Sequence, residues 1–549
     1  MLLAPLLLLA AQVPQQDSRL ANIPNTDTHF ALPSRHSLKD WEQRKVQLRR
    51  QILFAAGLDP MPEKAPLHAQ IFGRVETKDC TIEKVLLETM PGYYLGGNLY
   101  RPLNAAGKHP AVLNPHGHWT YGRLENQPLY SGPSLGANLA RQGYIVFAWD
   151  MVGYNDTAQT PHAFGTPAEQ LWSFGPYGLQ LWNSIRALDF VSELSDVDPT
   201  RIAMTGASGG ATQTISLAAI DDRIQYYAPV NMISSYMQGG DFCENAPGLR
   251  LNTNNVEIAA MIAPKPLLMV SAIGDWTKNT PTDEYPAIRR IYELYGKPEN
   301  VETIQLDAPH NFNKQNREAV YRFFAKQILH APDAANYTEK NADIQELQKM
   351  LALWGRALPP NAISYDQLFA EWKQRKGIAD LKLALATEWP EQVINDASAL
   401  SRPNVGDRIP YQWREGKGIP ALIIGGTLND APAGRPALTI EVFKTRDHSA
   451  KHFESFNQSD DQLRVQDILT ALAWLHNKYP GPIELIGIGT AASIQAEFAA
   501  AVAPIPLKLH IDRSAFTGTD EDFLKYFNVP GIQLAGCSAA ADRLTANLK

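Results

Sequence analysis

The feature that most constrains this chain is a serine-containing turn between a strand-like and a helix-like segment. The apolar run Ile202–Met204 predicts a buried strand, and Gly206-Ala-Ser208-Gly-Gly210 follows it. Ala211–Ile220 then has the pattern of a helix. Small residues two positions before and two after the serine let strand and helix pass close together around a strained backbone. Gly-x-Ser-x-Gly in this context predicts a nucleophile elbow, although the five-residue pattern alone is common and needs partners downstream.

Strands and helices alternate around this turn, which predicts an α/β fold with a mostly parallel sheet flanked by helices. An antiparallel pair, Thr81–Thr89 and Tyr94–Arg101, opens the sheet. Further strands are expected at Ala111–Leu113, Ile145–Trp149, Ile202–Met204, Tyr226–Val230, Leu267–Val270 and Val301–Leu306. Helices are expected at Ser134–Gln142, Leu179–Leu194, Ala211–Ile220, Tyr285–Tyr295 and Glu318–Leu329.

The chain has 549 residues, which is too long for one ordinary domain. An amphipathic helix is expected at 38–56, with Trp41, Val46, Leu48 and Ile52 on its buried face. The predicted organisation is a signal peptide at 1–18, an N-terminal helical segment at 19–72, a catalytic domain at 73–331, a helical connector at 332–380, and a degenerate, non-catalytic α/β domain at 381–549.

The first twelve residues are apolar but too short to span a bilayer as a stable helix. They resemble the apolar core of a secretory signal, so we expect a secreted or periplasmic protein. No other long apolar segment is present, so no membrane span is expected. The net charge of −7 is small for this length and argues against a nucleic-acid partner.

Three cysteines are too few, and odd in number, for a disulfide scaffold. No Cys/His spacing is that of a structural zinc site, and His448 and His452, four residues apart, lack a third ligand nearby. We therefore expect neither a metal nor a cofactor.

The last third contains an echo of the serine turn. A helix-like stretch, Asp467–Leu475, leads into Ile483–Ala491, as Ser184–Val191 leads into the elbow. Gly489 falls where Ser208 stands in the first copy. The stretch is interpreted as a degenerate copy without a nucleophile. The alternative is that any α/β segment gives such a pattern.

A serine nucleophile needs a base and a group that orients the base. Asp275 lies just past the strand Leu267–Val270, and His310 lies just past the next strand. The order Ser, acid, His is that of α/β-hydrolases. We assign Ser208 as nucleophile, His310 as general acid/base and Asp275 as the group that fixes the imidazole. Asp275 could instead cap a turn, Asp283 is a rival acid that resembles a helix N-cap, and His310 could be a surface loop residue.

The oxyanion hole needs two donors. The Gly209 N–H at the start of the helix is one candidate, and the His118 N–H in the loop Asn114–Trp119 is the other. Alternatively, the side chains of His116 and His118 are structural or bind substrate.

Aromatic side chains crowd the loops predicted to surround the site. Such rings suit sugar faces or aryl esters, or else pack beneath the loops. The long segment 239–250 follows the strand at 226–230, where a cap over the site is expected, and Glu244 and Arg250 there either contact substrate or pair with each other. The aromatic residues concerned are Trp119, Tyr121, Tyr154, Phe242 and Trp276.

Several longer strings carry a family resemblance. They are His116-Gly-His-Trp119, Asp150-Met-Val-Gly153, Gly206-Ala-Ser-Gly-Gly210, Cys243-Glu-Asn-Ala-Pro-Gly-Leu-Arg250, Gly274-Asp-Trp-Thr277 and His310-Asn-Phe-Asn313. Over about residues 75–330 the chain resembles bacterial α/β-hydrolases of the acetyl xylan esterase and dienelactone-hydrolase-like group. Dienelactone hydrolases proper carry Cys at the elbow, so Ser208 disfavours that lactone chemistry. The C-terminal domain resembles the non-catalytic second half of long members.

The resemblance implies a serine carboxylesterase that cleaves short-chain, acetyl-type esters, with plant polysaccharide as a candidate substrate and with no cofactor. One alternative is a peptidase of the prolyl-oligopeptidase type. Only about 50 residues separate the signal from the first strand, without blade-like repeats, which argues against it. The other is a non-catalytic binding protein of the cell envelope. Acyl and alcohol specificity and oligomeric state are left open.

Overall fold

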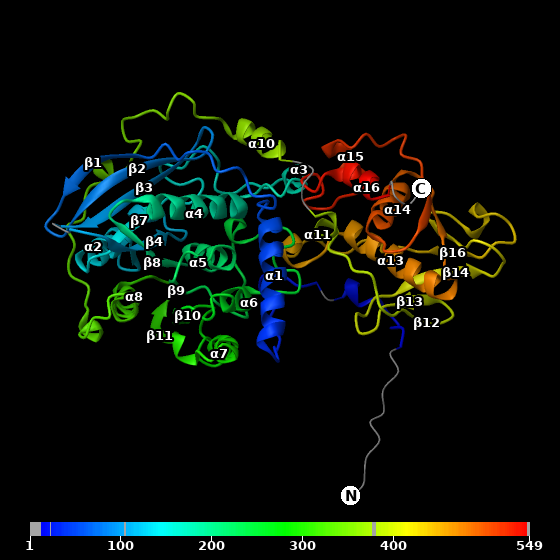
Figure 1. Cartoon of the computed structure of the whole chain (residues 1–549), viewed down its shortest axis with the longest axis horizontal. Coiled ribbons are helices and arrows are strands. Elements are labelled where there is room, and N and C mark those ends of the chain that lie inside the picture. The colour runs from blue at the N-terminus through cyan, green and yellow to red at the C-terminus, as the bar shows by residue number, and fades with distance from the viewer. Residues whose placement is uncertain (1–11, 22, 104–105, 376–379, 546–549) are drawn as a thin grey trace, which may run out of the picture. The chain divides into compact units, whose positions relative to one another are not determined.

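The computed structural model describes residues 12–21, 23–103, 106–375 and 380–545, which form two compact units. The larger unit consists of Thr26–Gly165 and Ser173–Gln374 (Figure 1). The smaller unit consists of the described parts of 1–25, 166–172 and 375–549. Residues 1–11 of the predicted signal peptide lie outside the described residues. Among the helices that are described, none combines the length and the apolar character that crossing a bilayer requires.

A mixed sheet forms the centre of the larger unit, in the strand order β1-β2-β3-β7-β4-β8-β9-β10-β11. The pairs from β1 to β7 are antiparallel, and those from β7 to β11 are parallel. The strands are β1 (Gln70–Glu76), β2 (Cys80–Met90), β3 (Tyr93–Pro102), β4 (His109–Pro115), β7 (Ile145–Trp149), β8 (Val197–Ala207), β9 (Tyr226–Val230), β10 (Leu267–Gly274) and β11 (Val301–Pro309). Two short strands, β5 (Asn126–Gln127) and β6 (Tyr130–Ser131), pair separately.

All eight strands expected in this region are confirmed. The edge strand β1 was not predicted, because its apolar residues Ile71, Phe72 and Val75 are interrupted by Gly73 and Arg74 and none of its residues is buried, so it lacks the apolar run of a central strand.

Helices cover both faces of this sheet (Figure 1). Val146 of β7 packs in one cluster with side chains of α2 and α8. The next residue, Phe147, points to the other face, where its ring lies 5.0 Å from that of Phe190 in α4. Burial on both faces explains why these strands are almost continuously apolar. The helices are α1 (Leu38–Ala55), α2 (Gly132–Arg141), α4 (Pro176–Glu193), α5 (Gly209–Ile220), α6 (Asn255–Ala260), α7 (Glu284–Leu294), α8 (Lys314–Gln327), α9 (Leu347–Met350) and α10 (Tyr365–Lys373).

Helix α1 begins where the Ser37 side chain accepts a hydrogen bond from the Asp40 N–H. Trp41, Leu48 and Ile52 are fully buried, as predicted, but Val46 is 63% exposed, so that prediction was wrong. At about 100° per residue, Val46 lies roughly 140° around the helix from Trp41. It therefore faces solvent, while the other three share one stripe.

A buried carboxylate anchors α1 to α6. Glu257 of α6 has no exposed side-chain surface and pairs with Arg44 of α1 at 2.8 Å and with Arg35 at 2.7 Å. Burial disfavours the ionised carboxylate, but the hydrogen bond and charge of Arg44 and the hydrogen bond from Thr253 outweigh it and lower the pKa of Glu257. The ionised form is therefore favoured more in the folded than in the unfolded chain.

Replacing Glu257 with glutamine should lower the free energy of unfolding at pH 7 by about 2 kcal/mol, because two half-buried arginines lose their partner. A depressed carboxyl pKa stabilises the fold above its unfolded value and less as pH falls through the folded value. Urea unfolding should therefore show the wild-type advantage shrinking below about pH 4.5. The matched control is Glu293→Gln, whose carboxylate pairs with Arg289 on the surface, and it should cost less than 0.5 kcal/mol. An equal cost for both variants would contradict the anchoring role.

The strand order reverses at the middle of the large sheet. After β4 the chain crosses to β7 on one side, and it then returns to β8 on the other side of β4. At such a switch point the loops after neighbouring strands diverge at the carboxyl edge, where ligands of α/β proteins bind. The loop after β4 contains His116–His118, and the turn after β8 contains Ser208.

The smaller unit repeats this topology. Its sheet has the order β12-β13-β14-β16-β15-β17-β18. The run β14-β16-β15-β17-β18 matches β3-β7-β4-β8-β9, with an antiparallel first pair and parallel pairs after it. Its strands are β12 (Ile394–Asn395), β13 (Ala399–Ser401), β14 (Ile409–Arg414), β15 (Ala421–Ile424), β16 (Ala437–Ile440), β17 (Ile483–Gly487) and β18 (Leu507–His510). The echo in the sequence therefore corresponds to a repeated sheet order.

Gly489 immediately precedes α14 with φ 85°, as Ser208 immediately precedes α5. The strands β12, β13 and β14 were not predicted, because they precede the strand–helix alternation that starts near residue 419. The helices of the smaller unit are α3 (Pro167–Gln170), α11 (Leu381–Leu385), α12 (Phe453–Phe456), α13 (Asp460–Lys478), α14 (Thr490–Val502), α15 (Asp520–Tyr526) and α16 (Cys537–Thr545).

Candidate active site

Ser208 occupies a strained turn between β8 and α5. Its φ of 56° and ψ of −121° lie outside the regions that L-residues prefer. A Cβ atom on Gly206 would lie 2.6 Å from the Pro115 carbonyl oxygen and 2.7 Å from the backbone of Gly210. The turn is therefore as crowded as the sequence predicted. The Ser208 N–H donates to the Val230 carbonyl oxygen at 3.1 Å, which ties the elbow to the end of β9.

The structure brings Asp275 and His310 together past the ends of neighbouring parallel strands, β10 and β11. The Nδ1 atom of His310 lies 2.8 Å from Oδ2 of Asp275. An ionised carboxylate only accepts, so Nδ1 carries the hydrogen and Nε2 is the ring nitrogen that can take up a proton from a nucleophile. The Asp275 side chain is 2% exposed and the His310 side chain is 26% exposed. This is the arrangement of a base held by its orienting acid.

Thr277 fixes the Asp275 carboxylate from the other side. Both the backbone N–H of Thr277, at 2.7 Å, and its hydroxyl, at 2.5 Å, donate to Oδ1 of Asp275. The two carboxylate oxygens therefore have separate tasks, since Oδ1 accepts from Thr277 and Oδ2 faces His310. The indole of Trp276 lies against the imidazole, with ring centres 4.2 Å apart.

The rival acid, Asp283, has a different neighbour. Its Oδ2 accepts a hydrogen bond from the Tyr236 hydroxyl at 3.1 Å. It lies at the N-terminus of α7 as the sequence suggested, although its side chain makes no capping hydrogen bond there. Between the two candidates, the contact with His310 belongs to Asp275.

Asn231 links the nucleophile turn to the histidine loop, and its role was not predicted from the sequence. It follows β9 with φ 52°, and its N–H donates to the Val270 carbonyl oxygen at 2.9 Å. Its side-chain amide donates to the carbonyl oxygen of Asn311, the residue after His310, at 3.0 Å. An Asn directly past a strand end is the signal in the sequence, because Asn tolerates left-handed backbone and bonds to nearby backbone groups.

The loop after β4 closely approaches the elbow. A Cβ atom on Gly117 would lie 2.7 Å from the Ala207 carbonyl oxygen and 3.2 Å from the Ser208 Cβ. A Cβ on Gly209 would lie 3.1 Å from Cε1 of His118. Glycine at 117 and 209 therefore permits the contact between this loop and the first turn of α5. The assignment of the Gly209 and His118 N–H groups as oxyanion donors stays a prediction that this proximity favours.

The His116 side chain makes hydrogen bonds that hold the loop after β4 in place. Its Nε2 accepts from the Met151 N–H at 2.9 Å, so Nδ1 carries the hydrogen that is donated to the Gly117 carbonyl oxygen at 2.6 Å. Burial lowers the pKa of His116 to about 3, which keeps the ring neutral. The structural alternative for His116 is the one that this geometry supports.

A buried ion cluster supports the turn after β7. Arg123 pairs with Asp150 and, at 2.6 Å, with Asp156, and all three side chains are almost wholly buried. Asp150 also accepts from the Asp156 N–H at 3.0 Å. Gly153 in the same turn has φ 82°, a conformation that favours glycine.

The predicted aromatic residues divide into two groups. Trp119 stacks on Tyr130 at 5.1 Å between ring centres and packs against the core, and Tyr154 contacts His116 and His162 edge-on, each at 5.0 Å. By contrast, Tyr121 and Phe242 are each 51% exposed. Tyr121 and Phe242 are therefore the predicted aromatic residues with the largest exposed surface.

Glu244 and Arg250 point into the protein. The Glu244 carboxylate accepts the N–H groups of Gly240 at 2.8 Å and Asp241 at 3.2 Å. Arg250 is 1% exposed and donates to the Glu244 backbone carbonyl oxygen at 2.9 Å. The two residues therefore meet through backbone rather than through a carboxylate–guanidinium pair. This geometry gives them a role in holding the loop and does not support contact with a substrate.

No protein-family model matches the chain. It is 26% identical over 303 residues to "Putative hydrolase YtaP" of Bacillus subtilis (strain 168), covering 51% of this chain and 99% of that protein. Among solved structures it is similar to methylesterase BT1017, with 30% identity, a TM-score of 0.52, and coverage of 61% of this chain and 75% of that one. A "putative acetyl xylan esterase" from Bacteroides fragilis NCTC 9343 has 15% identity, a TM-score of 0.42, and coverage of 64% and 92%.

Proposed function

Since the chain belongs to the group of ester-cleaving α/β-hydrolases that includes methylesterase BT1017, to which it is 30% identical, we propose that it is a serine carboxylesterase that cleaves short-chain, acetyl-type esters on carbohydrate through an acyl-enzyme. The observation that carries the proposal is the 2.8 Å contact between His310 Nδ1 and Asp275 Oδ2. It lies at the same carboxyl edge of the sheet as the strained Ser208. A free Nε2 on an oriented imidazole is what a serine nucleophile requires.

In the proposed mechanism, the hydroxyl of Ser208 attacks the ester carbonyl and gives its proton to Nε2 of His310. Asp275 accepts the Nδ1–H bond throughout and stabilises the imidazolium that forms. The N–H groups of Gly209 and His118 bind the oxyanion. The protonated imidazole then gives its proton to the leaving alcohol. A water molecule, activated by the same imidazole, releases the acid from Ser208 and restores the enzyme.

Esters on polysaccharide offer two candidate substrates, which differ in the position of the small group. Acetyl esters place the small group on the acyl side, and the resemblance of the sequence motifs to those of acetyl xylan esterases favours them. Methyl esters place the small group on the alcohol side, and the 30% identity to a methylesterase makes them the second candidate. Both proceed through the same serine chemistry, so the difference concerns which side of the ester is bulky.

The test uses p-nitrophenyl esters from acetate to octanoate, followed by acetylated xylan and methyl-esterified pectin. The proposal expects the highest kcat/KM on acetate, and acetate release from xylan that exceeds methanol release from pectin. Methanol release without acetate release would replace the acetylesterase by a methylesterase. A protein that cleaves peptide substrates but no ester would support the prolyl-oligopeptidase alternative, and one that only binds glycan would support the binding-protein alternative.

We further propose that the protein is exported, with 1–18 as its signal peptide, 19–72 as an N-terminal helical segment, 73–331 as the catalytic domain, 332–380 as a connector and 381–549 as a non-catalytic domain. Gly489 at the position that corresponds to Ser208 supports the last assignment, because glycine offers no nucleophile.

A further inference from the structure

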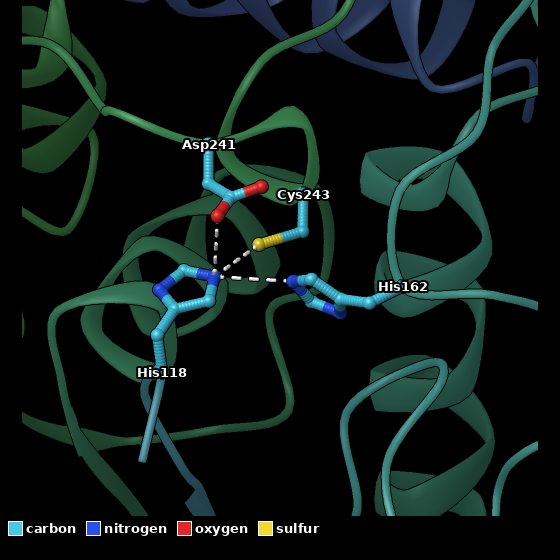
Figure 2. A group of neighbouring side chains, drawn as sticks. All are labelled: His118, His162, Asp241 and Cys243. Atoms are coloured by element: carbon cyan, nitrogen blue, oxygen red, sulfur yellow. Dashed lines mark hydrogen bonds and ion pairs between the residues drawn. The ribbon is translucent and has the colours of Figure 1, made fainter. Parts of the chain in front are cut away.

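Four side chains from three loops of the larger unit bring nitrogen, sulfur and oxygen atoms to one point (Figure 2). His118 follows β4, His162 lies between β7 and α4, and Asp241 and Cys243 lie in the loop after β9. Their potential ligand atoms all lie within 4.8 Å of one another. Nε2 of His118 is 3.2 Å from Nε2 of His162, 3.0 Å from Sγ of Cys243 and 3.6 Å from Oδ2 of Asp241. The proposed ester hydrolysis uses none of these side chains.

Neighbouring groups orient these atoms toward the common point. Nδ1 of His162 donates to the Val152 carbonyl oxygen at 2.6 Å, so Nε2 of the neutral ring presents its lone pair. A metal-binding histidine usually donates its other ring N–H to a backbone carbonyl, a carboxylate or water, as His162 does here. Oδ1 of Asp241 accepts from the Phe242 N–H at 2.7 Å, which leaves Oδ2 to face His118.

Hydrogen bonds alone satisfy this group poorly. Nε2 of His118 carries at most one proton, yet a nitrogen, a sulfur and an oxygen atom surround it. The Cys243 thiol adds one weak donor. A cation can bind all four atoms at once. With bonds of 2.0–2.3 Å, a tetrahedral site places its ligand atoms about 3.3–3.8 Å apart. The separations around His118, 3.0, 3.2 and 3.6 Å, lie within this range or a few tenths of an ångström below it.

We infer that His118, His162, Asp241 and Cys243 form a zinc site that joins the three loops beside the elbow. Two imidazoles, a thiolate and a carboxylate match the preference of Zn²⁺, whereas Mg²⁺ and Ca²⁺ prefer oxygen ligands. On binding, the thiol of Cys243 releases its proton to solvent and Zn²⁺ replaces it. Cys243 is fully buried, while the His118 and Asp241 side chains are 25% and 38% exposed and give the ion a path of entry.

The site lies next to the proposed nucleophile through His118. The His118 ring contacts the first residue of α5, since a Cβ on Gly209 would approach its Cε1 to 3.1 Å. Zinc would thus fix the loop that carries the proposed second oxyanion donor. This places the four ligands in a positioning role, and the binding of zinc itself does not depend on the proposed esterase activity.

The test measures metal on the full chain. Zinc is removed with a chelator, and Zn²⁺ is titrated back in competition with a chromophoric chelator. We expect one Zn²⁺ per chain with a Kd in the nanomolar range or tighter. Cys243→Ala and His162→Ala should each weaken binding by at least about 100-fold. Two variants serve as matched controls. Cys80→Ala removes another buried free thiol. His109→Ala removes another imidazole that is hydrogen-bonded to a backbone carbonyl, that of Gly143 at 3.0 Å. Both should bind zinc within twofold of wild type.

A second readout needs no variant to fold. Co²⁺ loaded into the wild-type chain should give the absorption of a tetrahedral ion with a thiolate-to-cobalt charge-transfer band. Wild-type zinc binding weaker than about 10 µM, equal binding by Cys243→Ala, or a cobalt spectrum without the thiolate band would each overturn the inference. Because metal content is measured directly, a failure to bind zinc can be distinguished from a failure to hydrolyse esters.

Discussion

Replacing Ser208 with alanine is expected to lower kcat for p-nitrophenyl acetate by about 10⁴-fold or more, with little change in stability. The acyl-enzyme forms only on the serine oxygen, so the remaining rate comes from the oxyanion donors and from binding. The measurement is initial-rate kinetics on both proteins, with circular dichroism to show that the variant is folded. Alanine keeps the Cβ that the turn already accommodates.

The control for this substitution is Ser192→Ala in α4. The Ser192 hydroxyl donates to the Leu188 carbonyl oxygen of its own helix at 2.7 Å and has no proposed role in the reaction. Its kcat should stay within twofold of wild type. An active Ser208→Ala protein would mean that another group performs the attack.

Asp275→Asn is expected to lower kcat by about 10³–10⁴-fold, because it reverses the imidazole tautomer. The N–H and hydroxyl of Thr277 both require an acceptor at the Oδ1 position. The amide oxygen of the new asparagine must therefore take that position, and its NH₂ group must face Nδ1 of His310. The imidazole hydrogen then lies on Nε2, and Nε2 can no longer accept the proton of Ser208. Steady-state kinetics on p-nitrophenyl acetate measures the loss.

The matched control is Asp283→Asn, the same change at the rival acid. Since its carboxylate accepts only the Tyr236 hydroxyl among the hydrogen bonds seen in the described residues, kcat should fall by less than about threefold. A large loss in Asp283→Asn together with a small loss in Asp275→Asn would exchange the roles of the two acids.

Much of the larger unit could be predicted from its sequence. Most of the parallel strands are apolar runs followed by a helical pattern, so the strand period and the helix period can both be read from the sequence. The short helix α6 between β9 and β10 was not predicted. The edge strand β1 was not predicted because its apolar residues form no continuous run and none of its residues is buried. Val46 was misplaced on α1 because an apolar residue need not face the core, and its angle around the helix puts it in solvent.

The pairing of Asp275 with His310 could be predicted because the order of the two residues along the chain and their places past strand ends are both visible in the sequence. The role of Ser208 as the nucleophile stays a prediction. The hydrogen bonds that hold these residues in place could not be predicted. Thr277 and Asn231 act through hydrogen bonds that depend on how loops from β9, β10 and β11 meet. The buried positions of Glu244 and Arg250 also depend on the fold of a loop that has no periodic pattern.

The zinc ligands could not be found from spacing at all. His118, His162 and the pair Asp241 and Cys243 come from three loops that are far apart in the sequence. Only the reversal of strand order between β7, β4 and β8, with β9 beside β8, brings those loops to one edge of the sheet. A sequence search for zinc relies on ligands that are close together in the chain, and only Asp241 and Cys243 are.

Labelling with a fluorophosphonate, followed by mass spectrometry of the digested protein, tests the central claim most directly. The account predicts one adduct per chain, on Ser208, with esterase activity lost in proportion to labelling. It also predicts no adduct in Ser208→Ala and slow labelling in Asp275→Asn, because the serine is then poorly activated. An adduct on a different residue, or equal labelling of the wild type and Ser208→Ala, would contradict the assignment of Ser208 as the nucleophile.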